Sequence, residues 1–421
     1  MGHRVVQILL FFFLMSYSTA FAGETTPKDT TNTIQLGFVL PEGVHKLSIP
    51  FEFNNNLIVI DVLLNNAIPL KFILDTGVRT TVLTEKIFTD LLNLQYSRKI
   101  TIPGIGGEKL VDAYVANNVT LQINDIIGRG HALIVLEHDL LQLKNYLGSN
   151  VHGILGYELF SRFIIEVNYD ARILTFYDPN YFKKKKRFDE IDMEIEDTKP
   201  YIQASFKLQD NNVYKGKFMV DTGASHSFLI DKHSDSSYYL PHPSLESHLG
   251  RGLAGDMYGD ISRIENLRLG QFSFDEVITT FPDTSTYDID IGVIPRNGTI
   301  GGGLLSRFRV IFDFIHGKLY LKKGRAFKKP FEYNLSGLVV KANGLHLNTY
   351  EITEVRKGSS AALAGLKAED KILIINGHYT KDLDLDEVLG LINQKENKTI
   401  RLLIQREGVK MKVQFKLQRQ V

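Results

Sequence analysis

The sequence predicts a mainly β protein with two duplicated lobes, followed by a smaller α+β module at the C-terminal end. Three observations support this fold class: an internal repeat, short apolar stretches of strand character, and a change of pattern after Leu335. A chain of 421 residues is long enough for about three domains. Hydrophobic residues make up 43% and charged residues 23%, so the composition excludes a disordered, collagen-like or coiled-coil chain.

The repeat is strongest around one heptapeptide. Lys71–Gly77 reads KFILDTG, and Lys217–Gly223 reads KFMVDTG 146 residues later. The triplet Ile154–Gly156 is matched by Thr299–Gly301 at an offset of 145 residues. Collinear matches at nearly one offset indicate a duplicated domain, and the offset is too long for the units of about 20 to 50 residues found in solenoids and propellers.

Both lobes are predicted to be mostly antiparallel β structure. Stretches rich in Val, Ile, Phe and Tyr stand between Asn, Asp and Gly clusters, as strands stand between turns. The predicted strands are 57–62, 71–74, 163–169, 173–177, 310–314 and 318–321, and the predicted turns are Asn65-Asn66, Asp170-Ala171 and His316-Gly317. The repeat gives a first lobe at 48–180, a charged linker at 181–198, a second lobe at 199–323, a linker at 324–332 and a separate module at 333–419.

Charge and residue usage exclude several classes of function. The 49 Lys and Arg against 48 Asp and Glu leave a net charge of +1, which gives no overall field to hold nucleic acid or an anionic membrane. The basic run Lys183–Arg187 is followed by acidic residues, so we interpret it as solvated linker. With no cysteine there is no disulfide, thiol nucleophile or cysteine zinc site. The 12 histidines show no repeated ligand spacing, and we expect no metal.

The first residues have the three parts of a secretory signal. Met1–Arg4 carry a positive charge, Val5–Met15 are apolar except for Gln7, and small residues end at Ala20–Ala22. The apolar run is too short for a retained membrane helix, and a buried core helix is the alternative. We therefore expect a signal peptide at 1–22, an N-terminal extension at 23–47, and a monomeric exported protein without a membrane segment, found in the periplasm or the medium if the source is bacterial.

The repeated Asp-Thr-Gly carries the candidate chemistry. In each copy an apolar strand delivers an aspartate, Asp75 or Asp221, to the edge of a core. One copy alone has an ordinary interpretation as a strand exit with a capping aspartate. Two copies at equivalent points of duplicated lobes predict that pseudo-twofold symmetry brings the carboxyls together. Two such carboxyls share one proton, so one can deprotonate a bound water while the other protonates an amide.

Over about residues 48 to 323 the chain resembles an aspartic protease of the retropepsin-like kind, with both halves fused in one polypeptide. The resemblance implies the bilobal acid-protease fold, with two pseudo-twofold-related β lobes. It implies that Asp75 and Asp221 are catalytic, and that the residues after them brace the loops, namely Thr76, Gly77, Thr222 and Gly223. Ile154–Gly156 and Thr299–Gly301 match the apolar-apolar-Gly element that lies behind the catalytic loops in that family.

The resemblance also implies flaps that close over the substrate. The first is expected at Gly104, Ile105, Gly106 and Gly107, and the second, with a looser match, at Leu253, Ala254 and Gly255. A plain glycine turn is the alternative for the first of these. A dinucleotide-binding loop needs a parallel sheet and a following helix, which the surrounding β pattern does not offer.

Three residues near the catalytic loops affect the expected activity. Val78 and Arg79 follow the first loop, where a small residue is usual in the family, and Arg79 is expected either to approach the carboxyls or to pair elsewhere. Val78 and its counterpart Ala224 offer no hydroxyl to stabilise an ionised carboxylate, so we expect activity to extend toward neutral pH. His226 is interpreted as a surface or pocket-wall residue.

Residues 333–419 resemble a bacterial-type PDZ domain. In that family a glycine loop and an exposed strand edge hold a peptide C-terminus, and here the carboxylate loop would be Ser336, Gly337, Leu338 and Val339. Glu369 stands where such domains commonly have Gly. A module that merely packs on the protease is the alternative.

Taken together, the sequence predicts an exported aspartic endopeptidase that needs no cofactor, with a PDZ domain that binds peptide C-termini for recruitment or regulation. The alternative is a weakly active or inactive peptide-binding protein that uses the same groove and PDZ site. A glycoside hydrolase with paired carboxylates is the third candidate. Such enzymes need carboxyl separations above about 5 Å and have no twofold Asp-Thr-Gly symmetry, so this function is disfavoured.

Overall fold

The computed structural model describes residues 35–103, 110–253, 255–283 and 295–421. The predicted signal peptide, most of the N-terminal extension, the first flap at Gly104–Gly107, and Ala254 of the second flap lie outside the described residues. The described chain is mainly β, as predicted. Its helices are all short, and within the described ranges none has the length and apolar character to span a membrane.

The first lobe is one mixed sheet built around the strand that carries the first Asp-Thr-Gly. That strand, β5 (Ile68–Leu74), pairs with β4 (Leu57–Leu64) on one side and runs parallel to β10 (Val151–Leu155) on the other. The predicted turn Asn65-Asn66 joins β4 to β5, with φ values of 47° and 56°. The remaining elements are β1 (Gly37–Val39), β3 (Glu52–Asn54), β6 (Val82–Leu83), β7 (Tyr96–Pro103), β8 (Leu110–Ile123), β9 (Ile126–Leu136), α1 (Ile87–Leu91), α2 (Leu143–Leu147) and α3 (Tyr157–Phe160).

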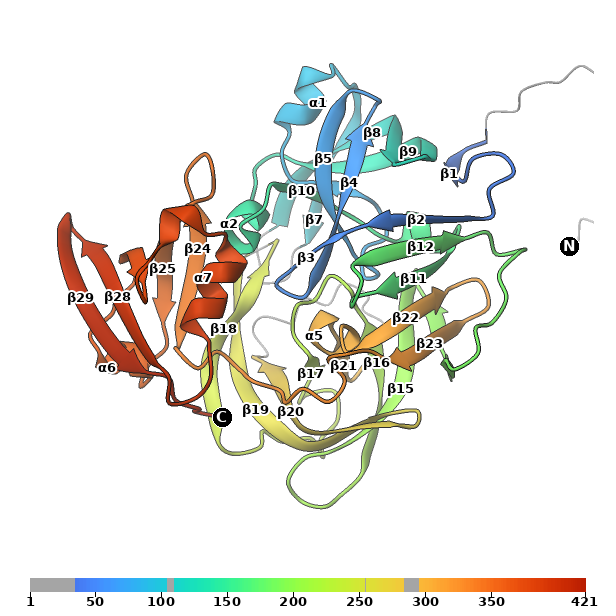
Figure 1. Cartoon of the computed structure of the whole chain (residues 1–421). Coiled ribbons are helices and arrows are strands. Elements are labelled where there is room, and N and C mark those ends of the chain that lie inside the picture. Colours follow the sequence, from blue (N-terminus) through green and yellow to red (C-terminus); the bar gives the residue numbers. More distant parts are fainter. Residues whose placement is uncertain (1–34, 104–109, 254, 284–294) are drawn as a thin grey trace, which may run out of the picture. The chain divides into compact units, whose positions relative to one another are not determined.

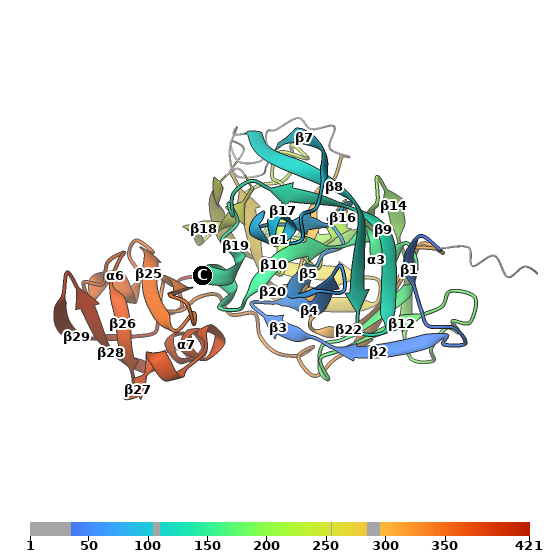
Figure 2. The same cartoon turned by 90° about the horizontal axis from the view of Figure 1, so that it is seen from above.

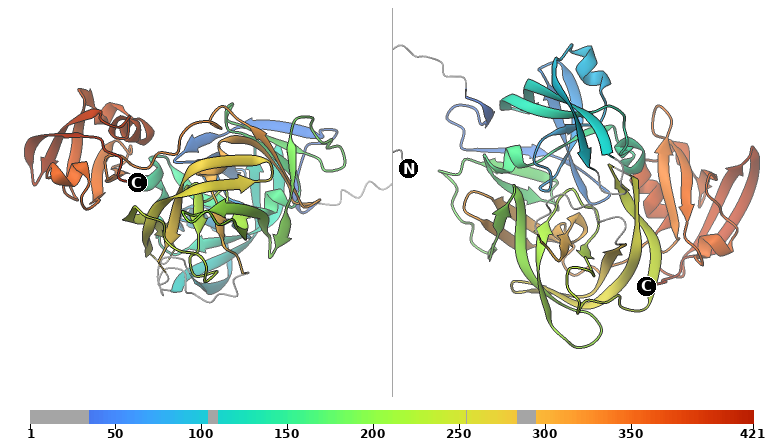
Figure 3. Two further views of the ribbon diagram at one scale, coloured as in Figure 1. Left: turned by 90° about the horizontal axis from the view of Figure 1, so that it is seen from below. Right: turned by 180° about the vertical axis from the view of Figure 1, so that it is seen from behind.

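The second lobe repeats this plan, which confirms the duplication (Figure 1). β16 (Tyr214–Val220) carries the second Asp-Thr-Gly, pairs with β15 (Lys199–Lys207) and runs parallel to β21 (Gly298–Ile300). Long hairpins join the other strands, as the view from behind shows (Figure 3). These elements are β14 (Glu194–Glu196), β17 (Phe228–Ile230), β18 (Ser244–Gly252), β19 (Gly255–Leu269), β20 (Phe272–Pro282) and α5 (Gly302–Leu305).

A third sheet takes strands from both lobes and joins them. β11 (Ile164–Asn168) of the first lobe pairs antiparallel with β22 (Phe308–Asp313) of the second, so the two lobes share backbone hydrogen bonds (Figure 1; Figure 2 shows β22 from above). The outer strands are β12 (Ile173–Tyr177), β2 (Lys46–Pro50), β23 (Lys318–Lys323) and β13 (Asp189–Asp192). Phe160 and Phe312 meet at a centroid distance of 5.4 Å in the core beneath this sheet. The relative position of the catalytic strands is therefore fixed by a shared sheet and core.

The charged interlobe segment is more ordered than a solvated linker. Its acidic half forms β13, which pairs with β23, and β14, which pairs with β15. In its basic half, Lys185 pairs with Glu166, a buried carboxylate of β11 that also contacts Arg309. Tyr177 donates a further hydrogen bond of 2.6 Å to Glu166. This segment therefore extends the sheet that joins the lobes.

The C-terminal module has a separate core and a sheet in the order β24-β25-β26-β28-β29. Ser359 caps the short helix α6 (Ser360–Leu363) by accepting from the Ala362 N–H at 3.2 Å. Asn376 and Gly377 form a tight turn, with φ values of 51° and 95°. The other elements are β24 (Leu338–Asn343), β25 (Thr349–Val355), β26 (Lys371–Ile375), β27 (His378–Tyr379), a 3-10 turn (Thr380–Asp382), α7 (Leu385–Ile392), β28 (Thr399–Arg406) and β29 (Val409–Lys416).

A capping box fixes the start of α7, and its removal tests the stability of the module. The Asp384 carboxylate accepts from the Glu387 N–H at 2.8 Å, while Glu387 accepts from the Asp384 N–H at 2.9 Å. Asp384→Ala should lower the free energy of unfolding of the module by about 1 kcal/mol. Urea denaturation followed by hydrogen exchange of the 385–392 amides measures this. Asp382→Ala, outside the box, is the control and should change stability by less than about 0.5 kcal/mol.

Candidate active site

The two Asp-Thr-Gly loops leave their strands at equivalent points and are tied down in the same way. The Asp75 N–H donates to the Leu155 carbonyl at 2.9 Å, and the Asp221 N–H donates to the Ile300 carbonyl at 2.9 Å. Leu155 and Ile300 belong to the apolar-apolar-Gly elements identified in the sequence. These elements thus lie directly behind the catalytic loops, as the family resemblance implies.

Glycine is required in both supporting elements because the catalytic loops pass against them. A Cβ atom at Gly156 would overlap the Asp75 carbonyl oxygen, and one at Gly301 would overlap the His226 carbonyl oxygen. Both neighbours are backbone atoms, which cannot rotate away. The repeated glycine therefore allows a close approach that holds each loop in place.

Two threonines lock the loops to each other across the lobe boundary. The Thr76 hydroxyl donates to the Val220 carbonyl at 2.7 Å and accepts from the Thr222 N–H at 3.0 Å. The Thr222 hydroxyl donates to the Leu74 carbonyl at 2.8 Å and accepts from the Thr76 N–H at 3.1 Å. Both side chains are buried. These four hydrogen bonds obey the pseudo-twofold symmetry and give each threonine the bracing position that the resemblance implies.

The structure brings the carboxyls of Asp75 and Asp221 within hydrogen-bonding reach of each other. Each carboxylate is oriented by its own loop: Gly77 N–H donates to Asp75 Oδ1 at 2.6 Å, and Gly223 N–H donates to Asp221 Oδ1 at 2.9 Å. A Cβ at Gly77 would lie 3.4 Å from both Asp221 carboxylate oxygens, and one at Gly223 would collide with the Asp75 carboxyl. Glycine at position 223 therefore leaves room for the facing acid, whereas a Cβ at position 77 would meet Asp221 only at ordinary contact distance.

Burial raises the pKa of Asp75 well above its ordinary value, and the neighbouring Asp221 charge raises it further. The hydrogen bond from Gly77 N–H opposes this by favouring the ionised form, as does the more distant charge of Lys199. Because the pKa of Asp75 is raised overall, the pair keeps a proton at a pH where an isolated aspartate has lost it. A proton shared between adjacent carboxyls is what acid and base catalysis by one pair requires.

The carboxyls open onto a cleft of about 610 Å³. This volume is in the range of ligand sites, which are mostly apolar with a few polar groups. Apolar side chains from both lobes line it, including Ile73, Leu147, Met219 and Leu229. Such walls suit apolar groups of a ligand, and both carboxyls line the same cleft.

His226 lies on the wall of this cleft, which agrees with its interpretation as a pocket-wall residue. Burial lowers the pKa of its imidazole to about 4. The ring has a hydrogen bond with the Thr299 backbone, whereas its Nε2 has no hydrogen-bond partner among the described residues. At neutral pH the cleft therefore presents an uncharged imidazole edge.

Arg79 points away from the carboxyl pair. Its guanidinium forms an exposed ion pair with Asp197, at the turn between β14 and β15. The backbone carbonyl of the neighbouring Val78 accepts a hydrogen bond from the Tyr157 N–H at 2.9 Å. The sequence left Arg79 either approaching the carboxyls or pairing with another residue, and the structure shows the second. Arg79 therefore adds no charge beside the two carboxyls.

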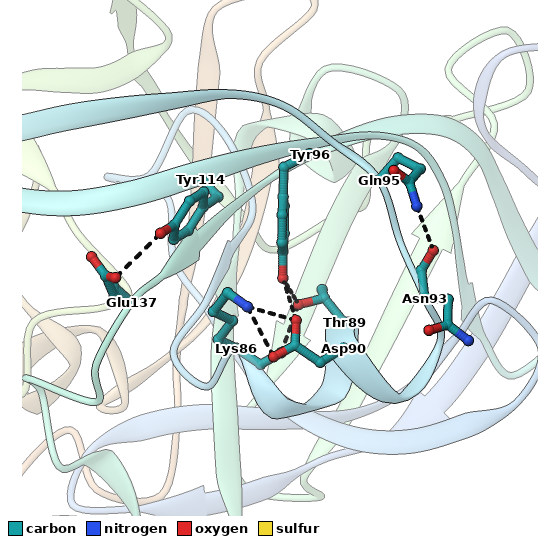
Figure 4. A network of polar contacts seen from close by, with 8 residues as sticks. All are labelled: Lys86, Thr89, Asp90, Asn93, Gln95, Tyr96, Tyr114 and Glu137. Atoms are coloured by element: carbon teal, nitrogen blue, oxygen red, sulfur yellow. Dashed lines mark hydrogen bonds and ion pairs between the residues drawn. The ribbon is translucent and has the colours of Figure 1, made fainter.

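The strands of the first flap hairpin, β7 and β8, are anchored at their base by a polar network (Figure 4). Lys86 contacts both carboxylate oxygens of Asp90 at 2.7 and 2.9 Å, and the Tyr96 hydroxyl donates to Asp90 at 3.0 Å. Tyr96 on β7 lies 4.8 Å from Tyr114 on β8, centroid to centroid, and Tyr114 donates to Glu137 at 3.2 Å. The network ties the hairpin to α1 and β9.

The second flap hairpin, β18 and β19, reaches the first lobe. Leu253 packs against an apolar cluster of that lobe that includes Val82 and Leu136. The adjacent Arg251 donates from Nε to the Leu140 carbonyl at 2.7 Å and pairs with Asp256 at 3.0 Å. Sequence reasoning missed Arg251 and the segment around Leu140, because neither belongs to a motif or to the repeat.

The predicted carboxylate loop of the C-terminal module is filled by its own side chains. Asn334 Oδ1 accepts from the Gly337 N–H at 2.9 Å, and Asn393 Oδ1 accepts from the Ser336 N–H at 3.3 Å. The Leu338 N–H donates to the Ser336 hydroxyl at 3.2 Å. These amides are the groups that the prediction assigned to a peptide carboxylate, and in this structure they already have acceptors.

Among the described residues no group of three or more His, Cys, Asp or Glu side chains is arranged to hold a metal ion.

Comparison with protein families agrees with this geometry. The aspartyl protease family model matches the chain twice, at residues 60–159 and 204–305, and each match contains one Asp-Thr-Gly loop. A PDZ domain model matches residues 351–406, a narrower range than the module defined by the structure. A comparison with curated proteins finds no match for this chain. The chain thus carries two aspartyl protease domains of the retropepsin-like kind and a C-terminal PDZ domain.

The interlocked threonines can be tested by separating the hydroxyl from the methyl group. Thr76→Ala removes two hydrogen bonds and leaves a buried N–H and a buried carbonyl unpaired, so the free energy of unfolding should fall by about 1–3 kcal/mol. Thr76→Ser keeps the hydroxyl and should lose about 1 kcal/mol or less. Chemical denaturation compares the two variants. Equal losses in both would show that the methyl packing, not the hydrogen bonding, holds the loops.

Proposed function

We propose that this protein is an exported aspartic endopeptidase that hydrolyses peptide bonds with a water held between Asp75 and Asp221. The observation that supports it most is the pair of half-buried, facing carboxyls on loops that are braced by reciprocal hydrogen bonds. An aspartate that only capped a strand would need neither the facing partner nor the glycine at position 223 that makes room for the Asp75 carboxyl. Export rests on the predicted signal peptide.

In the proposed mechanism Asp75 holds the proton of the pair, because its pKa is raised, and Asp221 is the base. Asp221 takes a proton from the water as the water oxygen attacks the carbonyl carbon of the substrate. Asp75 donates its proton to the carbonyl oxygen, which gives a neutral diol. The C–N bond then breaks as the nitrogen takes the proton from Asp221 and one diol hydroxyl returns its proton to Asp75. Water has been added across the bond, and the pair regains its starting state.

The alternative, a peptide-binding protein without turnover, keeps the same cleft. Its best argument in the sequence was Val78 and Arg79 after the first loop. Because Arg79 pairs with Asp197, the structure offers that alternative no support from its charge. The PDZ domain is proposed to bind peptides for recruitment or regulation.

Removing the base is the direct test of turnover. Asp221→Asn should reduce cleavage of denatured casein by about 100-fold or more, because amide nitrogen cannot accept the proton of the water. Asp235→Asn, an exposed turn carboxylate of the same lobe, is the matched control and should retain full activity. Binding of casein by the unsubstituted protein with no cleavage at any pH would favour the peptide-binding alternative.

The pH dependence follows from the direction of the Asp75 shift. Activity needs one proton on the pair, and it should be lost on the alkaline side as the pH rises through the raised pKa of Asp75. The alkaline limb should therefore lie well above the ordinary aspartate value, and activity should persist toward neutral pH. Measurement of kcat/KM from about pH 3 to about pH 8 checks this. An optimum confined to strong acid would contradict it.

A further inference from the structure

The edge strand of the PDZ domain is occupied by the protease part of the same chain. β24 pairs with β25 and is the last strand in the order of its sheet. The Ala342 carbonyl accepts from Asn145 Nδ2 of α2 at 2.8 Å, and the Leu338 carbonyl accepts from Asn334 Nδ2 at 2.8 Å. These two carbonyls are an even number of residues apart, so they lie on the same side of the strand, away from β25. This outward side is where an added peptide strand would pair.

Further contacts hold the PDZ domain at this place. Asn145 Nδ2 also lies 3.2 Å from Asn343 Oδ1. Directly after α2, Gly148 passes so close to Leu385 at the start of α7 that a Cβ atom at Gly148 would collide with the leucine side chain. The Asn55 backbone N–H donates to the Asp386 carboxylate of α7. The strand edge and the start of α7 are therefore both covered by the first lobe.

The opposite face of α2 forms a wall of the catalytic cleft. Leu143, Tyr146 and Leu147 line the cleft, whereas Asn145 points to β24. Residues 143 and 147 share a face because they are four positions apart on a helix. Val339, in β24 itself, lines the same cleft. One short helix thus contacts the PDZ edge on one side and the substrate site on the other.

The same segment holds the second flap hairpin. Arg251 donates to the Leu140 carbonyl, just before α2, and its side chain has a hydrogen bond with Tyr146. The position of residues 140–147 therefore determines where both a cleft wall and a flap anchor lie.

We propose that α2 is an internal ligand of the PDZ edge strand, and that this docking shapes the substrate cleft and anchors the flap hairpin. The PDZ domain then acts on peptide hydrolysis as a brace for residues 140–147, a role that rests on the proposed function. An extended peptide can add to β24 only after α2 leaves, because both need the Ala342 carbonyl. Occupation of this edge by another strand would release the brace.

Two asparagine variants test the docking. Asn145→Ala removes the hydrogen bonds to β24, whereas Asn150→Ala changes an exposed asparagine that follows the helix and does not line the cleft. For cleavage of one peptide substrate, Asn145→Ala should raise KM about 3- to 10-fold with kcat changed by less than about twofold, which is the effect of losing about one hydrogen bond in binding the substrate. Asn150→Ala should match the unsubstituted protein.

A second measurement does not depend on turnover. Hydrogen exchange of the full-length protein should show faster exchange of the 338–343 amides in Asn145→Ala than in Asn150→Ala, because the edge of β24 is uncovered. If both variants exchange alike at these amides, α2 does not occupy the edge and the proposal fails. Faster exchange with an unchanged KM would show that α2 docks on β24 but that this docking does not shape the cleft. If the unsubstituted protein cleaves nothing, the proposed function fails, while the exchange result still decides whether α2 is docked.

Discussion

The reciprocal hydrogen bonding of Thr76 and Thr222 is the constraint on which the rest of the site depends. Each hydroxyl bonds to the backbone of the opposite loop, so the distance between the loops is set by two short side chains that have no freedom to move when buried. Because Gly223 also makes room for the Asp75 carboxyl, the two carboxyls lie close together despite their mutual repulsion. The shared sheet of β11 and β22 supports the same geometry from a greater distance.

The raised pKa of Asp75 is a consequence of this constraint. Two free carboxylates would separate and hydrate, whereas here the backbone hydrogen bonds hold both in place. Ionising both would be unfavourable, so the pair keeps one proton. Arg79 would have changed this balance if it had reached the pair. Its ion pair with Asp197 keeps this guanidinium away from the carboxyls, so the pKa of Asp75 is set mainly by burial and by the Asp221 charge.

The sequence predicted the parts that depend on local pattern and on repetition. The Asp-Thr-Gly loops and the glycines behind them follow from residue types at fixed spacing, and each lies in the structure where the pattern predicts. The start of α7 at Leu385 depends instead on the capping box of Asp384 and Glu387. β13 was interpreted as linker because it contains three acidic residues and one apolar residue, Ile191, which is a weak pattern for an edge strand.

The contact between α2 and β24 shows why the sequence did not predict the remaining contacts. Asn145 and Ala342 are 197 residues apart, and an asparagine that bonds to a backbone carbonyl leaves no trace in hydrophobic periodicity. Yet the contact changes how the PDZ domain is understood. A segment tethered beside its binding edge competes as if it were present at millimolar concentration, so a free peptide with ordinary affinity for that edge meets a strong intramolecular competitor. Because the Ser336 and Gly337 amides are bonded to Asn393 and Asn334, a peptide carboxylate would have to displace these two side chains as well before it could occupy the predicted loop.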